Sequence, residues 1–269
     1  MVVLAPGSIL QSMFFGRYFK KFKGSKFLEV GPGSGHLTSL LLKEQMSGTI
    51  IELSKISCDE LTARFSGYIS DGLLDIRNES FLSIEGKSTN YDLVVSAMVL
   101  EHLDTKQEQA FIEKCLNSLK ENGVLMLFVP ANSNYWGVED EIAGHFRRYL
   151  SSDLIALLDP TKWEVNLVRG LTWPLSNILL PISNFFVKRA EIMNLSLEMH
   201  ERTLLSGHRD VMYKTVFPRY FRFFLNPFTL YPFYVLQNIF KHNSNSLVLF
   251  MQATKVANVD NARTYNQKK

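Results

Sequence analysis

The sequence has few of the features that mark a disulfide-stabilised or strongly charged protein. Its 269 residues include two cysteines, Cys58 and Cys115. Each lies inside an expected helix, which favours reduced thiols that pack in a core over a disulfide framework or a metal site. The net charge is +3, with 20% charged residues that are scattered along the chain. Charge therefore gives no argument for a nucleic-acid partner, and we expect none.

Long hydrophobic runs are also missing. The nearest candidate, Leu171–Val187, carries two prolines and several polar residues, whereas a membrane-spanning helix needs roughly 18 to 20 apolar residues in succession. The first 26 residues lack the basic start, the long apolar centre and the small-residue cleavage site of a secretory signal. We therefore expect a cytoplasmic protein without a spanning helix.

Strand and helix patterns alternate over the first 170 residues of a chain that is 46% hydrophobic. Apolar runs such as KFLEV, GTIIEL, YDLVVSA and GVLMLFVP are separated by helical patterns such as HLTSLLLKEQ and KQEQAFIEKCLNSLK. Near-continuous apolar strands separated by helices are typical of a parallel sheet covered on both faces. The sequence therefore predicts an α/β fold with a doubly wound sheet, in which WEVNLVRG and NSLVLFMQATK supply the sixth and seventh strands.

The chain is expected to have five parts: an N-terminal helical segment (1–24), a ligand-binding core (25–172), a helical and aromatic insertion (173–243), the last core strand (244–255) and a flexible tail (256–269). The insertion is expected because about 70 residues between two strands are too many for an ordinary loop. The tail is expected to be flexible because it is polar and terminal.

The stretch FLEVGPGSGHLTSLLL places three glycines between a strand and a helix, at Gly31, Gly33 and Gly35. Absent side chains and outward-facing helix amides would let a ligand approach the main chain there. In a dinucleotide fingerprint a third glycine would stand where this chain has His36. The acid Glu29, just before the loop, would repel a pyrophosphate and attract a cationic amino-acid group. The pattern thus disfavours NAD and favours a nucleotide-like ligand with positive charge.

Further polar and small residues follow the next three strands. Glu52 lies 21 residues after Gly31, the usual position of a carboxylate that binds both ribose hydroxyls. Glu79 follows the third strand, where it would bind an adenine amino group or cap the next helix. The fourth strand ends with Ser96, Ala97 and Met98, at the edge where open α/β sheets bind ligands. We expect an adenine ring against Met98.

Four motifs in order resemble those of class I S-adenosylmethionine-dependent methyltransferases of the small-molecule type: LEVGPGSG, IIELS, YDLVVSAMVLEHL and LKENGVLMLFVPA. The resemblance spans about Phe27 to Leu158. It implies S-adenosyl-L-methionine as cofactor, a seven-stranded, mostly parallel sheet, and a seventh strand that runs antiparallel beside the fifth. It also implies that the glycine loop holds the methionine part. The implied cofactor contacts are Glu29, Gly31, Gly33, Gly35, Glu52, Leu53, Glu79, Ser80, Ser96, Ala97, Met98 and His102.

A later segment, EDEIAGHFRRY, resembles the GHxRRY segment of a subgroup near the ubiquinone-pathway O-methyltransferases. Its His145 is the candidate catalytic base, since a histidine has a pKa near neutrality. Alternatively, His145 orders the wall of the pocket. His102 is assigned to the cofactor side, with a base role as the lesser alternative. No metal is expected, because methyl transfer from a sulfonium does not need one.

Four further residues are candidates for binding the acceptor: Tyr135, Trp136, Arg147 and Arg148. Tyr135 and Trp136 would line its pocket, although plain packing explains them nearly as well. The two arginines would clamp a carboxylate or phosphate of the acceptor. Alternatively, one of them pairs with a nearby acid, at position 139, 140 or 141, and holds the loop.

The stretch from Met212 to Phe240 holds 11 of the 33 aromatic residues of the chain. It would form a cap with its own core, a homodimer interface, or an acceptor tunnel that rests on the inner face of a membrane, because helices with aromatic and basic faces lie in lipid interfaces. Single-stranded nucleic acid would also bind aromatic and basic residues, but no RNA-binding motif accompanies them.

The predicted activity is methyl transfer to an oxygen of a hydrophobic small molecule, lipid or polyketide-like intermediate. Protein and RNA methyltransferases share the core, but those that modify amino groups commonly carry NPPY-like or DPPY-like motifs where this chain reads SAMV. A nicotinamide oxidoreductase is disfavoured by His36 and by the acid before the loop. A non-catalytic relative that binds the cofactor is the third alternative.

Overall fold

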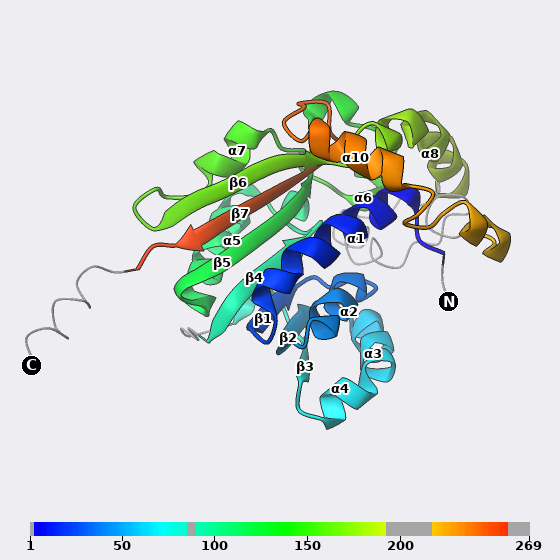
Figure 1. The fold of residues 1–269 in the computed structure, drawn as a ribbon. Helices are drawn as coiled ribbons and strands as arrows, with labels where there is room; N and C mark the ends of the chain where they lie inside the picture. Colours follow the sequence, from blue (N-terminus) through cyan, green and yellow to red (C-terminus); the bar gives the residue numbers. More distant parts are fainter. Residues whose placement is uncertain (1–2, 85–89, 192–216, 258–269) are drawn as a thin grey trace, which may run out of the picture.

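The computed structural model describes residues 3–84, 90–191 and 217–257. Seven strands form one sheet in the order β3-β2-β1-β4-β5-β7-β6, and helices lie against both of its faces (Figure 1). This confirms the predicted doubly wound α/β fold. The strands are β1 (Lys26–Val30), β2 (Ser47–Glu52), β3 (Leu74–Asn78), β4 (Tyr91–Ala97), β5 (Leu119–Pro130), β6 (Trp163–Leu171) and β7 (Val248–Lys255).

Five neighbouring strands are parallel, and β7 runs antiparallel to both β5 and β6. The reversed last strand beside β5 is the arrangement that the family resemblance implied. Because β7 separates β5 from β6, these two strands point in the same direction. The carboxyl ends of all strands except β7 therefore meet at one edge of the sheet, where ligands of open α/β sheets bind.

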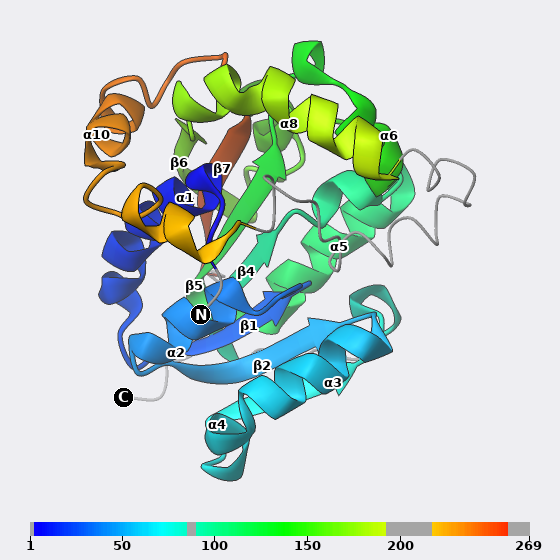
Figure 2. The ribbon, with the colours of Figure 1, turned by 90° about the vertical axis from the view of Figure 1, so that its right-hand side faces the viewer.

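The sheet is buried on both faces because the apolar residues of its strands alternate between two cores. In β5, Met126 and Phe128 belong to one hydrophobic cluster, whereas Leu125 and Leu127 belong to the other. The first cluster also contains side chains of α1 (Pro6–Tyr18), α2 (His36–Lys43) and α10 (Tyr231–Ile239). The second contains side chains of α5 (Thr105–Ser118) and α7 (Ser151–Ala156). Figure 2 shows the sheet between these layers.

The N-terminal helix α1 is part of the core cover. Its Phe15 ring lies 4.4 Å from the Phe128 ring of β5, and its Phe14 ring lies 5.1 Å from the Phe250 ring of β7. Edge-to-face pairs of this kind bury large apolar areas. The remaining helices are α3 (Lys55–Arg64), α4 (Ser66–Ser70), α6 (Val138–Ala143) and α8 (Leu175–Glu191), with 3₁₀ turns η1 (Phe19–Phe22), η2 (Phe81–Ser83), η3 (Leu100–His102), η4 (Ser133–Tyr135) and η6 (Arg219–Phe223).

The segment between β6 and β7 contains α8, η6 and α10. Residues 192–216 and the tail from 258 lie outside the described residues, so part of the aromatic stretch 212–240 is not described. The boundaries of the five expected parts remain predictions. Throughout the three described ranges, every helix falls short of the length and apolar character that a bilayer crossing requires.

Candidate active site

The carboxyl edge of the sheet holds a row of residues in the left-handed backbone region. Gly31 follows β1 with φ 70°, Met98 follows β4 with φ 56°, Asn132 follows β5 with φ 60°, and Thr172 follows β6 with φ 69°. For residues other than glycine such a conformation costs on the order of 1–3 kcal/mol and is concentrated at functional sites. The strained residues at the ends of three strands indicate that this edge is a ligand-binding site.

The glycines of the loop after β1 play two different roles. A Cβ atom on Gly31 would lie 2.3 Å from Val99, and one on Gly35 would lie 2.5 Å from Leu61, so both glycines permit close packing. A Cβ atom on Gly33 would meet no atom within 4 Å. Gly33 therefore borders open space, as expected for the part of the loop that faces a ligand.

Glu52, which is predicted to bind the ribose, lies at this loop. The amide of Gly33 donates to Glu52 Oε2 at 3.4 Å, and the amide of Ser54 donates to Oε1 at 2.9 Å. The next residue, Leu53, is an exposed apolar side chain. The end of β2 thus brings a carboxylate against the glycine turn, and the ribose-binding role that the spacing of 21 residues suggested remains a prediction.

Glu29 is buried beneath the loop. Its Oε2 atom accepts a hydrogen bond of 2.7 Å from Thr38 Oγ1 in α2, and the residue is 1% exposed. Burial raises its pKa to about 7, against the opposing effect of the Thr38 hydrogen bond. The contact ties β1 to α2, and a cationic ligand group nearby would favour the ionised form.

His36, which occupies the position of the third fingerprint glycine, connects the loop to the N-terminal helix. Its Nε2 atom lies 2.6 Å from the Ser12 hydroxyl of α1. Burial, together with the charge of Arg64, lowers the pKa of His36, so the imidazole is held neutral. The residue that departs from the dinucleotide fingerprint therefore links the start of α2 to α1.

The other predicted cofactor contacts lie along the ends of β3 and β4. Ser96 is buried and donates to the Val30 carbonyl at 3.2 Å, which links β4 to β1. Met98 donates its amide to the Phe128 carbonyl at 2.8 Å. Glu79 lies 4.0 Å from Arg77, and Ser80 and Ala97 are both partly buried. The adenine roles assigned to this group remain predictions.

On the acceptor side, the GHFRRY segment is organised around one buried acid, Asp140. Its Oδ1 atom lies 2.8 Å from His145 Nδ1 and accepts a bond of 2.8 Å from Arg148 Nε, while Oδ2 accepts the Gly137 amide at 2.9 Å. Burial would raise the pKa of Asp140, but these hydrogen bonds outweigh it and the pKa is lowered. An ionised Asp140 orients His145 with its Nε2 atom away from the acid.

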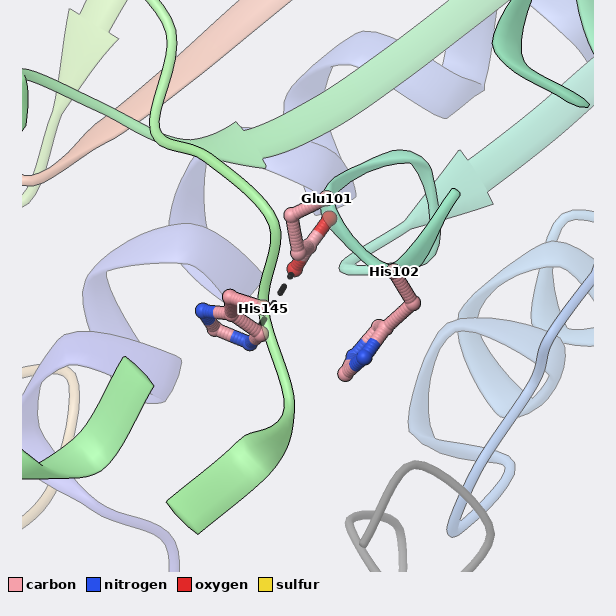
Figure 3. A group of neighbouring side chains, drawn as sticks. All are labelled: Glu101, His102 and His145. Carbon is pink, nitrogen blue, oxygen red and sulfur yellow. Dashed lines mark ion pairs between the residues drawn. The ribbon is translucent and has the colours of Figure 1, made fainter. Parts of the chain in front are cut away.

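Glu101 lies on the other side of His145. Its Oε1 atom is 3.9 Å from His145 Nε2, and the His102 and His145 rings meet edge-on with centroids 4.7 Å apart (Figure 3). Glu101 is fully buried, and neither of its carboxylate oxygens has a hydrogen-bond partner among the described residues. Burial raises its pKa to about 7, and the charge of His145 opposes that rise. The fold thus brings Glu101 and His102 of η3 next to His145 of the GHFRRY segment.

The candidate acceptor arginines are both engaged by acids. Arg148 is held by Asp140, as the alternative expectation had it, and also donates to the Ala131 carbonyl. Arg147 binds Glu108 of α5 at 3.1 Å, a partner 39 residues away that local spacing did not suggest. Tyr149 donates to the same carboxylate at 2.6 Å. These contacts hold the GHFRRY segment in place. An acceptor that binds either arginine would have to compete with these acids.

Tyr135 and Trp136 lie in and just after η4, on the chain that leads from β5 to α6. Tyr135 is partly buried, whereas Trp136 is 40% exposed. Sequence reasoning missed Glu101 as a member of the site and treated Asp140 solely as an arginine partner. The adjacent acid and histidine in LEH were the available signal, but nothing in the local sequence says that this acid is buried without a partner.

Residues 28–125 match a family model described as a methyltransferase domain. A search of curated proteins found no significant match.

Solved structures share the fold at low identity. The [4+2]-cyclase SpnF is 12% identical, with a TM-score of 0.53 over 91% of this chain and 79% of that one. The N-methyltransferase NodS from Bradyrhizobium japonicum, in complex with S-adenosyl-L-homocysteine, is 18% identical, with a TM-score of 0.52 over 62% of this chain and 81% of that one. A 1,6-didemethyltoxoflavin-N1-methyltransferase from Burkholderia thailandensis, with 1,6-didemethyltoxoflavin and S-adenosylhomocysteine bound, is 11% identical, with a TM-score of 0.53 over 93% of this chain and 80% of that one.

At these identities the similarity to solved structures establishes the fold, and SpnF shows that this fold also serves another reaction. The family match begins within β1 and ends within β5, and it includes the glycine loop and Glu52. Residues 28–125 therefore match a methyltransferase domain within a Rossmann-like fold, and this match implies S-adenosylmethionine as the cofactor.

Proposed function

We propose that this protein transfers a methyl group from S-adenosylmethionine to an oxygen atom of a hydrophobic small molecule or lipid. The observation that carries the proposal is the array Asp140–His145–Glu101 at the carboxyl edge of the sheet. It adjoins the cofactor loop, because Val99, two residues before Glu101, is the residue that a Cβ atom on Gly31 would strike.

The array suits proton removal from a hydroxyl or phenol. The cofactor supplies an electrophilic methyl carbon, and the departing sulfur takes the electrons of the C–S bond. Asp140 accepts the Nδ1 proton of His145, so Nε2 is left to take the proton of the acceptor. Asp140 and Glu101 would then stabilise the imidazolium. Such a base contributes on the order of 10²–10⁴ in rate, and positioning of the reactants contributes more.

A labelled-methyl assay tests the proposed activity. The purified protein, incubated with methyl-labelled S-adenosylmethionine and a lipid extract of its host, is expected to move label into an organic-soluble product while forming S-adenosylhomocysteine. Product chemistry then separates oxygen acceptors from nitrogen acceptors, because ethers and esters differ from methylamines in acid–base behaviour. Label recovered on protein or RNA, or cofactor binding without any transfer, would contradict the proposal.

The hydrophobic character of the acceptor is supported by the surface between β6 and β7. Eleven of the twenty exposed large hydrophobic side chains in the described residues fall between positions 178 and 240. Such concentrations of exposed apolar side chains mark interaction surfaces. They are Ile178, Ile182, Phe185, Tyr220, Phe223, Phe224, Phe228, Tyr231, Val235, Ile239 and Phe240.

We infer that the segment between β6 and β7 rests, through its exposed side chains, on an anionic lipid surface at the inner face of a membrane, from which the acceptor is taken. On α8, Ile178, Ile182 and Phe185 recur at helical spacing and are all exposed, so they form an outward apolar stripe. Exposed basic residues accompany the stripe and η6: Lys188, Arg189, Arg219 and Arg222. Apolar side chains with a basic fringe match an anionic interface better than they match a second copy of the same basic surface.

Vesicle sedimentation tests this contact. The protein is expected to sediment with vesicles that contain phosphatidylglycerol, less with pure phosphatidylcholine, and less at high salt. Phe223→Ser combined with Phe228→Ser should abolish sedimentation, because these side chains are 79% and 89% exposed. Ile155→Ser on α7, also an exposed apolar residue, is the matched control and should change nothing. Unchanged sedimentation of the double variant, or a dimer that forms through this face without lipid, would refute the lipid contact.

A further inference from the structure

We propose that Glu101, His102 and His145 form a binding site for a divalent transition-metal ion of the zinc type. One donor atom from each of these residues lies within 4.8 Å of the other two. Figure 3 shows the three side chains converging from η3 and from the segment after α6. The inferred binding does not depend on the proposed function, although the chemical role of the ion does.

The spacing of the donors suits a small ion. Zinc binds imidazole nitrogen and carboxylate oxygen at about 2.0–2.2 Å, so two donors on one ion lie at most about 4.2 Å apart. Glu101 Oε1 and His145 Nε2 are 3.9 Å apart, which meets this limit without movement. The widest pair in the cluster, within 4.8 Å, would close by less than about 1 Å through side-chain rotation.

Glu101 supplies the strongest independent observation. The residue is 0% exposed, and both of its carboxylate oxygens lack a hydrogen-bond partner among the described residues. A buried carboxylate in this state is unfavourable unless a cation or a proton satisfies it. The side chain points toward His145 (Figure 3), so a cation between them would satisfy the acid.

Asp140 would orient His145 from the side of the ring that faces away from the ion. A histidine that binds a metal commonly donates its other ring N–H to a carboxylate, which fixes the tautomer and the ring orientation. His145 Nδ1 lies 2.8 Å from Asp140 Oδ1, and Arg148 holds the same oxygen at 2.8 Å. The lone pair of Nε2 is therefore directed to the side on which Glu101 lies.

The donor set also indicates the class of ion and its use. Two imidazoles and one carboxylate suit zinc, cobalt, nickel, iron or manganese better than calcium or magnesium. Three protein ligands leave at least one position open. An acceptor hydroxyl bound there would have a lower pKa and release its proton to solvent; its oxygen would then attack the methyl carbon as the C–S bond breaks. In the metal-bound protein His145 would be a metal ligand and would not act as the base. This proposal differs from the expectation, drawn from the sequence, that the protein binds no metal.

Titration of the chelator-treated protein with Zn²⁺ and Co²⁺, without cofactor or acceptor, tests the site. One ion is expected per chain by calorimetry, and the Co²⁺ form should show visible absorption typical of low coordination number. Asp140→Asn should weaken binding by about 10- to 100-fold, and Glu101→Gln by more. His242→Gln, which removes an exposed histidine outside the cluster, is the control and should bind like the wild type.

X-ray absorption on the wild-type Co²⁺ protein is expected to show imidazole ligands, and this measurement holds even if Glu101→Gln fails to fold. No stoichiometric binding, oxygen-only ligation, or affinity unchanged by Glu101→Gln would each overturn the proposal and leave Glu101 satisfied by a proton instead. Transfer that persists in metal-free protein would remove the catalytic role of the ion, while the proposed function stands. Metal binding without methyl transfer would refute the proposed function alone.

Discussion

Replacing Glu52 with alanine is expected to weaken binding of S-adenosylmethionine by about 10²- to 10⁴-fold and to leave the protein folded. Two hydrogen bonds from ribose hydroxyls to an ionised carboxylate contribute roughly 1.5–3 kcal/mol each, and about 1.4 kcal/mol corresponds to a factor of ten. Glu52 is partly exposed, and its carboxylate accepts hydrogen bonds from the main-chain amides of Gly33 and Ser54. Its loss therefore removes little packing. Calorimetry with the cofactor measures the effect.

Two comparisons show whether such a loss reflects the site. Glu60→Ala removes an exposed glutamate of α3 and should leave cofactor affinity unchanged. Gly33→Ala places a methyl group in space where no atom lies within 4 Å, so it should reduce cofactor affinity with modest loss of stability. Gly31→Ala would bring a methyl group to 2.3 Å from Val99 and should destabilise the fold instead. If Glu52→Ala binds the cofactor as tightly as the wild type, the ribose lies elsewhere.

Replacing His145 with glutamine is expected to lower turnover by about 10²- to 10⁴-fold for a hydroxyl or phenol acceptor. Cofactor affinity should stay within a few-fold of the wild type, because the side chain belongs to the acceptor-side array with Asp140 and Glu101. Single-turnover kinetics measure the transfer step apart from product release. His242→Gln is again the matched control.

Asp140→Asn should also reduce turnover, because the amide cannot accept the Nδ1 proton in the same way and Arg148 loses its ion pair. With a carboxylate acceptor, His145→Gln should leave turnover nearly unchanged, because a carboxylate is already ionised and needs no base. Full activity of His145→Gln on an identified hydroxyl acceptor would exclude the base role of His145 and a catalytic role for an ion bound to it, while binding of the ion would still be decided by the metal titration. Removing the ion with a chelator and measuring turnover distinguishes the base role from the role of the ion, which mutation of His145 does not.

Much of the cofactor side could be predicted because its signals are local in the chain. The loop at Gly33 follows a buried strand directly, and Glu52 ends the next strand, so parallel pairing of β1 with β2 is sufficient to bring the two together. The resemblance even anticipated the antiparallel β7 beside β5. What spacing could not distinguish is which glycine borders open space, because that depends on Val99 and Leu61 from other segments.

The acceptor side depended on contacts between distant segments. Glu101 and His145 are 44 positions apart, and Arg147 finds Glu108 across 39 positions. A pattern of residue types shows neither that Glu101 is buried without a partner nor that Met98 adopts a positive φ. Both are properties of how η3, α5 and the GHFRRY segment pack together.

The sequence by itself determined the layered α/β sheet, the bare turn after its first strand and the carboxylate beside that turn. These follow from periodicity and from the rule that parallel strands end at one edge. The tertiary structure alone decided that Glu101 and His102 share a site with His145, and that Asp140 rather than an acceptor engages Arg148. The physical reason is that burial and charge pairing arise when remote segments exclude water together, which residue spacing does not record.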